Sequence, residues 1–288
     1  MMPFHDEQLN FMICLAKNRP EFLDSFFRFL NYFDTDYFYF LLIPFIWIGF
    51  SYRWGIRVFY LLAINALLNH FMKELFGWPR PSTDCPSIGM FHFKSFGFPS
   101  GAAQSALLLG GLLIHYWKTK ASWILGSLYI LLISFSRLYL GVHYPLDILG
   151  GWILGAILLF CFIRSIGKIE HFLEKQGLFF AAGLCMAIPL AILLIDSNHP
   201  KISYLVASFL GAGLGVIFSL NYGLYLPPPN RIWKGCLRAA LAIGSLFLIF
   251  IFWPQGYPPF AKIFTLTLWT SLVASPLCRA TQKILKIS

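Results

Sequence analysis

The chain has 288 residues, of which 58% are hydrophobic and 12% are charged, and its 22 basic and 12 acidic residues give a net charge of +10. Soluble domains carry about 25% charged residues, so the composition excludes an ordinary water-soluble globule. A peripheral or single-pass protein is also excluded, because the charge-free stretches 202–230 and 239–261 each exceed the roughly 20 residues that cross a bilayer. The basic residues form no patch interleaved with polar residues, which argues against nucleic-acid binding.

The N-terminal residues, MMPFHDEQ, lack the basic start and apolar stretch of a cleaved signal peptide, so we expect the first span to direct membrane insertion. Residues 6–33 set phenylalanine and leucine among the charged residues Glu21, Asp24 and Arg28. This pattern predicts an amphipathic helix that lies at the membrane interface. We therefore expect residues 1–36 to form an N-terminal interfacial segment outside the cytoplasm.

Continuous apolar windows then predict about nine transmembrane helices, and so an all-α, polytopic bundle. A transmembrane β-barrel would instead need alternating segments of about ten residues. Several windows are short for a full crossing, so their boundaries are approximate. The windows cover residues 37–50, 57–72, 101–117, 121–139, 146–163, 177–195, 204–222, 236–253 and 260–275.

The lysine and arginine content of alternate loops predicts the orientation, because cytoplasmic loops carry an excess of both residues. The loops after the odd-numbered spans hold 13 basic and 2 acidic residues, a net charge of +11. The other side, with the N-terminus, holds 9 basic and 10 acidic residues, a net charge of −1. We therefore expect a cytoplasmic C-terminus and an extracytoplasmic N-terminus, on the periplasmic or lumenal side.

Three polar segments reach the expected extracytoplasmic end of the bundle, where spans meet loops. They are KELFGWPRP at 73–81, PSG at 99–101 and SRLYLGVHYPLD at 136–147. Together they supply three cations, a Ser-Gly turn that opens a helix, a histidine, and a carboxylate one helical turn after that histidine. The candidate site residues are Lys73, Arg80, Ser100, Gly101, Arg137, His143 and Asp147.

This set of residues is suited to phosphate chemistry. The planar guanidinium of arginine can make two hydrogen bonds to phosphoryl oxygens, and lysine adds a compact charge. The Ser100-Gly101 turn begins a predicted helix, so free backbone N–H groups and the positive helix end would face an anion there. His143 can act as a nucleophile or a base. Asp147 can accept a hydrogen bond from the other ring nitrogen of this histidine and so fix its tautomer. No carboxylate cluster has the spacing of metal ligands, so we expect neither a metal nor another cofactor.

The three segments resemble the signature of the type 2 phosphatidic acid phosphatase superfamily, which reads KxxxxxxRP, PSGH and SRxxxxxHxxxD. All fixed positions of the first and third blocks match, with the same order and spacing. The resemblance implies a catalytic core over residues 37–165 and additional transmembrane helices over 166–288. The nine-span arrangement is also similar to the glucose-6-phosphatase branch.

The resemblance further implies a two-step reaction that needs no metal. His143 would attack phosphorus to form a phosphohistidine, with Asp147 orienting its ring, and water would then release phosphate. The residues that would hold the phosphoryl oxygens are Lys73, Arg80, Ser100, Gly101 and Arg137.

Position 102 departs from the family pattern, because Ala102 replaces the PSGH histidine, the expected general acid for the leaving oxygen. Alanine cannot donate a proton, and positioned acid catalysis contributes about 10²- to 10⁴-fold, so we expect impaired hydrolysis of simple monoesters. The chain is either a natural pseudo-phosphatase or an inactivated form of a protein whose native sequence reads PSGH. The retention of the other catalytic positions favours the second explanation. His70 and His92 are alternative proton donors.

The sequence thus predicts an integral membrane phosphatase that acts on a lipid phosphate or diphosphate in the extracytoplasmic leaflet. Three alternatives remain open: a catalytically silent lipid-phosphate binder or transporter, a glucose-6-phosphatase-like hydrolase of a soluble phosphate, and transfer of the phosphoryl group to another lipid or sugar. The pairing of His143 with Asp147 distinguishes an enzyme from a binder, because recognition alone does not require it.

Overall fold

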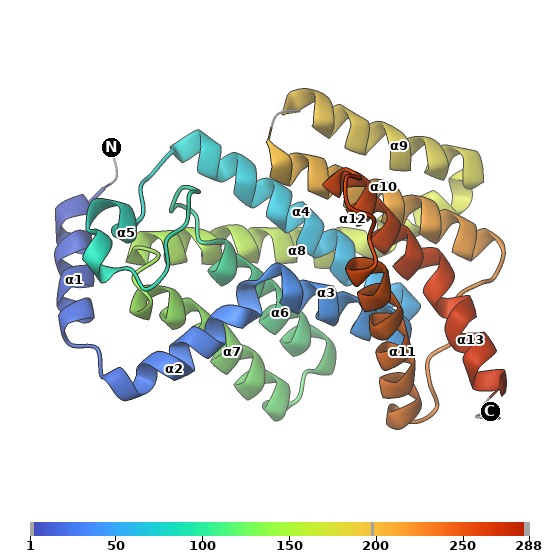
Figure 1. Cartoon of the computed structure of the whole chain (residues 1–288), viewed down its shortest axis with the longest axis horizontal. Coiled ribbons are helices and arrows are strands. Elements are labelled where there is room, and N and C mark those ends of the chain that lie inside the picture. Colours follow the sequence, from blue (N-terminus) through green and yellow to red (C-terminus); the bar gives the residue numbers. More distant parts are fainter. Residues whose placement is uncertain (1–2, 197–198, 285–288) are drawn as a thin grey trace. The chain divides into compact units, whose positions relative to one another are not determined.

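The computed structural model describes residues 3–196 and 199–284, and within these ranges every regular element is helical, which confirms the all-α prediction. The helices form two compact units (Figure 1). Unit 1 runs to Phe38 and from Ile64 to Ser165, and unit 2 from Tyr39 to Ala63 and from Ile166 onward. The functional division at residues 36 and 165 stays a prediction, because helix grouping does not assign functions.

The N-terminal part of unit 1 contains two helices where the sequence predicted one. Helix α1 (His5–Lys17) ends before Pro20 and helix α2 (Glu21–Leu30) begins after it, because a proline lacks a donor and restricts the residue before it. Helix α2 is amphipathic as predicted, since the charged Glu21 and Arg28 are exposed whereas Phe27 and Leu30 are buried. A 3-10 turn, η1 (Asn31–Asp34), follows α2 directly.

The centre of unit 1 is an antiparallel pair of helices, α6 (Gly101–Trp117) and α7 (Lys120–Tyr139), which run side by side (Figure 1). Their backbones approach closely at two facing glycines, because a Cβ on Gly110 would lie 2.7 Å from the Gly126 carbonyl oxygen and the reverse also holds. Small residues allow such contacts between membrane helices. The chain then turns into the long helix α8 (Pro145–Gln176).

Helix α4 (Tyr52–Phe76) contributes its second half to unit 1 and ends at the first polar segment. The connection to α6 contains three prolines and is mostly irregular, as predicted, with a short helix α5 (Pro81–Asp84) and a 3-10 turn η3 (Pro86–Ile88). Pro81 occupies the first turn of α5, where its missing N–H costs nothing.

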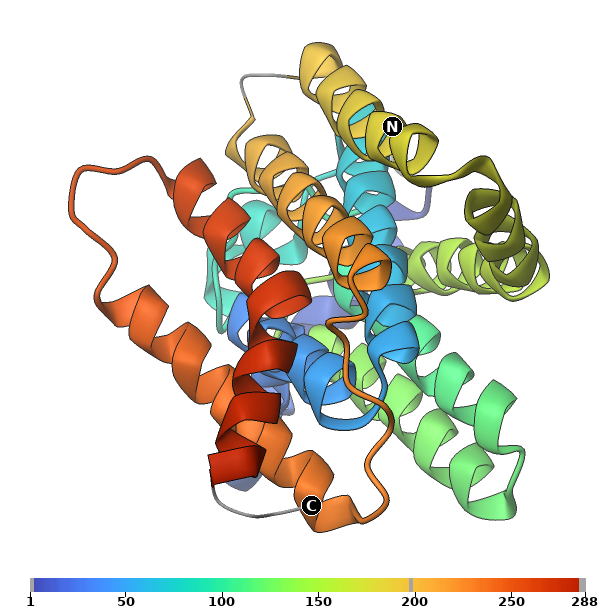
Figure 2. The ribbon, with the colours of Figure 1, turned by 90° about the vertical axis from the view of Figure 1, so that its right-hand side faces the viewer.

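Unit 2 packs through small residues. Figure 2 shows α10 between α9 and α12, and a Cβ on Gly211 or Gly215 would overlap Thr267 or Ser271. Between α4 and α8, Arg57 donates two hydrogen bonds of 2.7 Å to the Glu170 carboxylate. The elements of unit 2 besides the first half of α4 are most of α3 (Asp36–Pro44), the π-helical η2 (Phe45–Phe50), the end of α8, α9 (Leu178–Ile195), α10 (Pro200–Asn221), α11 (Ile232–Ile251), α12 (Pro259–Leu268), the π-helical η4 (Trp269–Val273) and α13 (Ala274–Ile284).

Among the described residues, seven helices are long and apolar enough to cross a membrane, or eight if the bent pair Glu21–Asp34 and Asp36–Phe50 forms one span. Helix α6, with 17 residues, covers the predicted window 101–117. The nine predicted windows overlap the described helices, and three of them run one or two residues past a helix end. The seven or eight candidate spans within the described ranges are fewer than the nine predicted. Large apolar side chains such as Leu131, Ile153 and Phe160 are exposed on these helices, as a lipid-facing surface requires. The chain is an integral membrane protein.

Candidate active site

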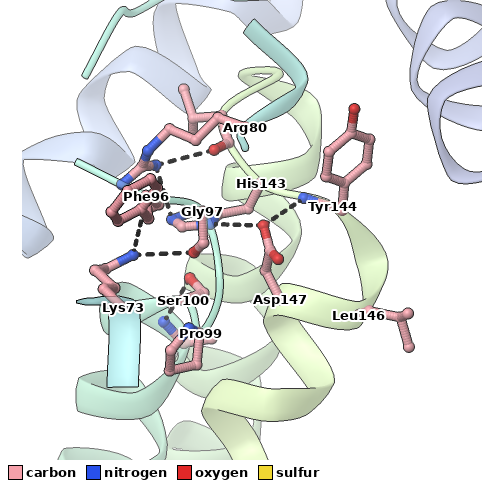
Figure 3. A network of polar contacts seen from close by, with 12 residues as sticks. Lys73, Arg80, Phe96, Gly97, Pro99, Ser100, His143, Tyr144, Leu146 and Asp147 are labelled. Atoms are coloured by element: carbon pink, nitrogen blue, oxygen red, sulfur yellow. Dashed lines mark hydrogen bonds and ion pairs between the residues drawn. The ribbon is translucent and has the colours of Figure 1, made fainter. Parts of the chain in front are cut away.

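The three polar segments meet within unit 1, where the α4–α6 connection and the α7–α8 connection approach the start of α6 (Figure 3). Their functional side chains are buried, each at most 6% exposed. Buried charges are costly unless they are paired or hydrogen-bonded, so such a cluster indicates a site. The residues brought together are Lys73, Arg80, Ser100, Arg137, His143 and Asp147.

His143, in the α7–α8 connection, is held by hydrogen bonds at both ring nitrogens. Its Nδ1 lies 3.1 Å from Oδ2 of Asp147, and its Nε2 lies 3.1 Å from Nη1 of Arg80. A guanidinium only donates and a carboxylate only accepts, so Nδ1 carries the proton and Nε2 presents its lone pair. Burial, followed by the positive charges of Arg80, Lys73 and Arg137, lowers the pKa of His143 well below its ordinary value. The imidazole is therefore neutral at pH 7, which is the nucleophilic form.

Asp147 holds this arrangement from the first turn of α8. Its Oδ2 also accepts a hydrogen bond from the Tyr144 N–H at 2.9 Å, and its backbone carbonyl accepts one from the Ser100 N–H at 2.9 Å. The start of α8 is thereby tied to the start of α6. Gly97 closes the site from the other side, because a Cβ there would lie 2.6 Å from the Pro79 carbonyl oxygen and 3.0 Å from Asp147 Oδ2. Only glycine fits at that position.

Lys73, in the last turn of α4, is directed into the site by backbone carbonyl groups. Its Nζ donates hydrogen bonds to the carbonyl oxygens of Phe96 at 2.6 Å and Gly97 at 2.9 Å (Figure 3). These two hydrogen bonds hold the Lys73 ammonium group against the backbone of residues 96–97. The positive charge of Lys73 helps to lower the pKa of the His143 imidazole.

Arg80 is the cation nearest to the histidine. Its Nε and Nη2 donate to the backbone carbonyl and the hydroxyl of Ser95 at 2.7 and 3.0 Å, and Nη1 donates to the Val142 carbonyl at 3.0 Å. The guanidinium also lies 4.9 Å from the ring centroid of Phe93. Burial lowers the pKa of Arg80 to about 10, which leaves the side chain protonated at neutral pH. A phosphoryl group bound by this guanidinium would lie beside Nε2 of His143.

Arg137, in the last turn of α7, reaches the N-terminal segment. Its Nη1 donates to Asn31 Oδ1 at 2.8 Å and lies 3.6 Å from Asp34 Oδ2. Its charge still contributes to the lowered pKa of His143, so it remains within electrostatic reach of the imidazole. The sequence pattern did not single out Asn31 and Asp34, because they lie more than a hundred residues before Arg137.

The start of α6 combines a cap with close packing. Ser100 is the N-cap, and its hydroxyl oxygen accepts from the Ala103 N–H at 3.4 Å; its hydroxyl proton can still be donated to a ligand. Asn69 of α4 donates to the Pro99 carbonyl at 3.1 Å and to Gln104 Oε1 at 3.0 Å. A Cβ on Gly101 would lie 3.1 Å from Asn69 Oδ1. Asn69 therefore fixes this turn, and its only sequence signal is a polar side chain one helical turn before Lys73.

Ala102 is 2% exposed and belongs to an apolar cluster that includes Phe27 and Leu30 of α2 and Ile133 of α7. The position where the resemblance expects a histidine is thus packed against apolar side chains. Of the two alternative proton donors, His70 is buried on α4 and His92 is exposed in the α4–α6 connection.

The arrangement can bind a phosphoryl group and attack it. Buried cations and free helix N–H groups supply the ligands for its oxygens, and a neutral imidazole with a fixed tautomer supplies the nucleophile. The protein's own positive charges can neutralise the phosphoryl charge.

The chain is similar to known membrane phosphatases over the segment that contains this site. Residues 54–170 match the model of the PAP2 superfamily. The dihydrosphingosine 1-phosphate phosphatase YSR3 of Saccharomyces cerevisiae is 29% identical over 62% of this chain and 47% of the relative. The undecaprenyl-diphosphatase of Sulfolobus acidocaldarius is 31% identical over 42% of this chain and 61% of the relative. The chain thus spans about half the length of the first relative and about three fifths of the second.

The fold is also similar to that of a solved membrane protein. The crystal structure of a transmembrane PAP2 type phosphatidylglycerolphosphate phosphatase from Bacillus subtilis superposes with a TM-score of 0.50 at 23% identity, over 59% of this chain and 89% of that one. The segment that matches the family model contains all three polar segments and His143. Residues 54–170 of this chain are therefore similar to the PAP2 superfamily.

Proposed function

We propose that this chain is a membrane phosphatase that removes phosphate from a lipid monoester or diphosphate through a phosphohistidine at His143. The observation that carries the proposal is the orientation of the His143 ring. Its Nδ1 lies 3.1 Å from Oδ2 of Asp147, and its Nε2 lies 3.1 Å from Nη1 of Arg80. A phosphate that accepted this Arg80 hydrogen bond would free the Nε2 lone pair and present its phosphorus to it. Simple recognition of an anion does not need a histidine held in this tautomer.

In the first step, Nε2 of His143 forms a bond to phosphorus while the bond to the leaving oxygen breaks and that oxygen takes the electron pair. Lys73, Arg80, Arg137 and the N–H groups at the start of α6 hold the other phosphoryl oxygens, where negative charge is spread in the transition state. Asp147 stabilises the positive charge that develops on the ring. In the second step, water attacks phosphorus, and phosphate and free His143 are released.

The leaving oxygen lacks the proton donor that the PSGH histidine would supply, because residue 102 is alanine. A leaving group of low basicity departs without a proton, whereas an alkoxide does not. We therefore expect this chain to hydrolyse lipid diphosphates and aryl phosphates faster than alkyl monoesters.

A lipid substrate is supported by the membrane-embedded helices and by relatives whose names describe lipid phosphatases. The extracytoplasmic side is supported by the loop charges of +11 and −1. Cysteine labelling in intact cells tests that side. A membrane-impermeant reagent should modify Lys94→Cys and leave Lys120→Cys unmodified, and the opposite result would reverse the topology.

The packing of Ala102 among apolar side chains favours one second candidate, a lipid-phosphate binder without catalysis. Phosphate release from a lipid diphosphate, an aryl phosphate and alkyl monoesters in detergent micelles separates the two. If the chain is a phosphatase, phosphate release should persist when metal ions are chelated and should be lost in the His143→Asn variant. Binding of lipid phosphates without release from any substrate would support the binder, and release that survives His143→Asn would contradict the mechanism.

A further inference from the structure

Tyr144 and Asp84 join the two connections that carry the catalytic groups. The Tyr144 hydroxyl donates a hydrogen bond of 2.6 Å to Oδ2 of Asp84. Tyr144 follows His143 directly in the α7–α8 connection, and its side chain is fully buried. Asp84 ends the short helix α5, whose N-cap is Arg80, and its N–H donates to the Arg80 carbonyl at 3.2 Å. One hydrogen bond between side chains therefore links the segment of Arg80 to the segment of His143.

This link bears on the distance on which the proposed reaction depends. Nη1 of Arg80 lies 3.1 Å from Nε2 of His143, and the phosphoryl group would enter between these two atoms. Attack requires reacting atoms about 3–3.5 Å apart, and a displacement of about 1 Å can cost about 10²-fold in rate. The Tyr144 N–H also donates to Oδ2 of Asp147 at 2.9 Å (Figure 3). A shift of Tyr144 would therefore move both the nucleophile and the carboxylate that orients it.

Helix α1, which lies beside α5 (Figure 1), holds both sides of this link. Nε2 of His5 lies 3.0 Å from the same Oδ2 of Asp84. One turn later, Oε1 of Gln8 accepts a hydrogen bond of 3.0 Å from the Leu146 N–H, one of the first N–H groups of α8, which have no partner within their own helix. Met12, on the same face of α1, is fully buried in an apolar cluster with side chains of both connections. These contacts restrain the positions of α5 and of the first turn of α8.

A second tyrosine–aspartate pair in unit 1 provides a comparison. The Tyr139 hydroxyl donates a hydrogen bond of 2.6 Å to Oδ1 of Asp24. This pair fastens α2 to α7, and neither residue belongs to α5 or to the turn that carries His143. The two pairs have the same chemistry and length, so they should stabilise the fold to a similar extent. Only the pair of Tyr144 and Asp84 is placed to act on the reaction.

We propose that Tyr144 and Asp84 are positioning residues, whose hydrogen bond sets the distance between the Arg80 guanidinium and the His143 imidazole. The inference rests on the proposed function, because this distance matters only if His143 attacks a phosphoryl group held by Arg80. Neither side chain touches the substrate in this scheme, and neither takes part in bond making.

Steady-state phosphate release from an aryl phosphate, by the full-length chain in detergent micelles, tests this role. Tyr144→Phe removes only the hydroxyl and keeps the buried ring. Asp84→Leu removes the acceptor, whereas Asp84→Asn keeps an oxygen that can accept the same hydrogen bond. Tyr139→Phe is the matched control, because it deletes an equally short bond of the same kind. The melting temperature of each variant reports its loss of stability.

We expect Tyr144→Phe and Asp84→Leu each to lower kcat about 10- to 100-fold. KM should change little, because the other groups that bind the phosphate stay in place. The double variant should be no slower than the slower single variant, since both substitutions remove the same interaction. Asp84→Asn should retain most of kcat. Tyr139→Phe should lower the melting temperature and leave kcat unchanged.

An unchanged kcat in Tyr144→Phe, or an equal loss of kcat in Tyr139→Phe, would overturn the positioning role and leave the bond a structural one. Losses that multiply in the double variant would overturn it too. The proposed function is judged separately, by whether release from the unchanged chain depends on His143. Absence of such release would overturn the proposed function, and the positioning role with it.

Discussion

Replacing Ala102 with histidine restores the group that the family motif carries at this position. The side chain would enter a packed cluster with Phe27, Leu30 and Ile133, where Ala102 is 2% exposed. Overpacking of this kind costs about 1–3 kcal/mol of folding stability. A positioned general acid accelerates the reaction by about 10²- to 10⁴-fold, which lowers the barrier by about 2.7–5.4 kcal/mol. We therefore expect a folded, less stable and faster enzyme.

The assay is phosphate release by purified protein in detergent micelles, over substrates whose leaving groups differ in basicity. The gain for Ala102→His should be about 10²- to 10⁴-fold for an alkyl phosphate and small for an aryl phosphate or a diphosphate. Ala106→His is the matched control, because Ala106 lies one turn further along α6 in the same cluster. It should cost stability and give no gain. Adding His143→Ala to Ala102→His should abolish the activity.

Two results would refute this reasoning. Equal activity of the unchanged chain and of Ala102→His toward an alkyl phosphate would mean that the proton comes from another group, with His70 and His92 the next residues to test. Inactivity of both toward every lipid phosphate, in folded protein, would favour the binding protein over the enzyme.

Three further predictions concern the groups around the site. Asp147→Asn should lower kcat for a diphosphate by about 10³- to 10⁴-fold, because the His143 ring is then no longer held in the tautomer with its proton on Nδ1. KM should change little. Asn69→Leu leaves the Pro99 carbonyl without its buried donor, so thermal unfolding should show a loss of about 1–3 kcal/mol and KM should rise. The hydrogen bond with Asp84 raises the pKa of His5 in the folded protein. This pair should therefore stabilise the fold fully at pH values below the ordinary histidine pKa of about 6.5. The stabilisation should be lost as the pH rises through the raised pKa of the folded state. His5→Gln should flatten that dependence of the melting temperature, and an unchanged dependence would contradict the assignment.

The positions of the membrane helices could be predicted because each must be apolar over most of its length to cross lipid. The division of α4 between two units could not, because Tyr39–Ala63 groups with the C-terminal helices through packing that apolar windows do not encode. The break in the N-terminal segment was missed although Pro20 gives a local signal, since amphipathic periodicity continues on both sides of it.

The meeting of Lys73, Arg80, His143 and Asp147 was predictable because the motif spacing places each at a helix end or in an adjoining loop. The backbone carbonyls that hold the cations were not, since a main-chain acceptor has no sequence signature. The contact of Arg137 with Asn31 and Asp34 depends on how α2 packs against α7. Long-range packing of this kind is not visible in a single sequence.

The most direct test of the account is to trap the phosphorylated enzyme. The missing histidine at position 102 would also activate the attacking water in the second step, by microscopic reversibility, so the intermediate should accumulate with a diphosphate or aryl phosphate. Peptide mass spectrometry after an alkaline quench should find phosphate on His143, none in His143→Asn, and less in Ala102→His. Phosphate on a different residue, or phosphate release that persists in His143→Asn, would contradict the central claim.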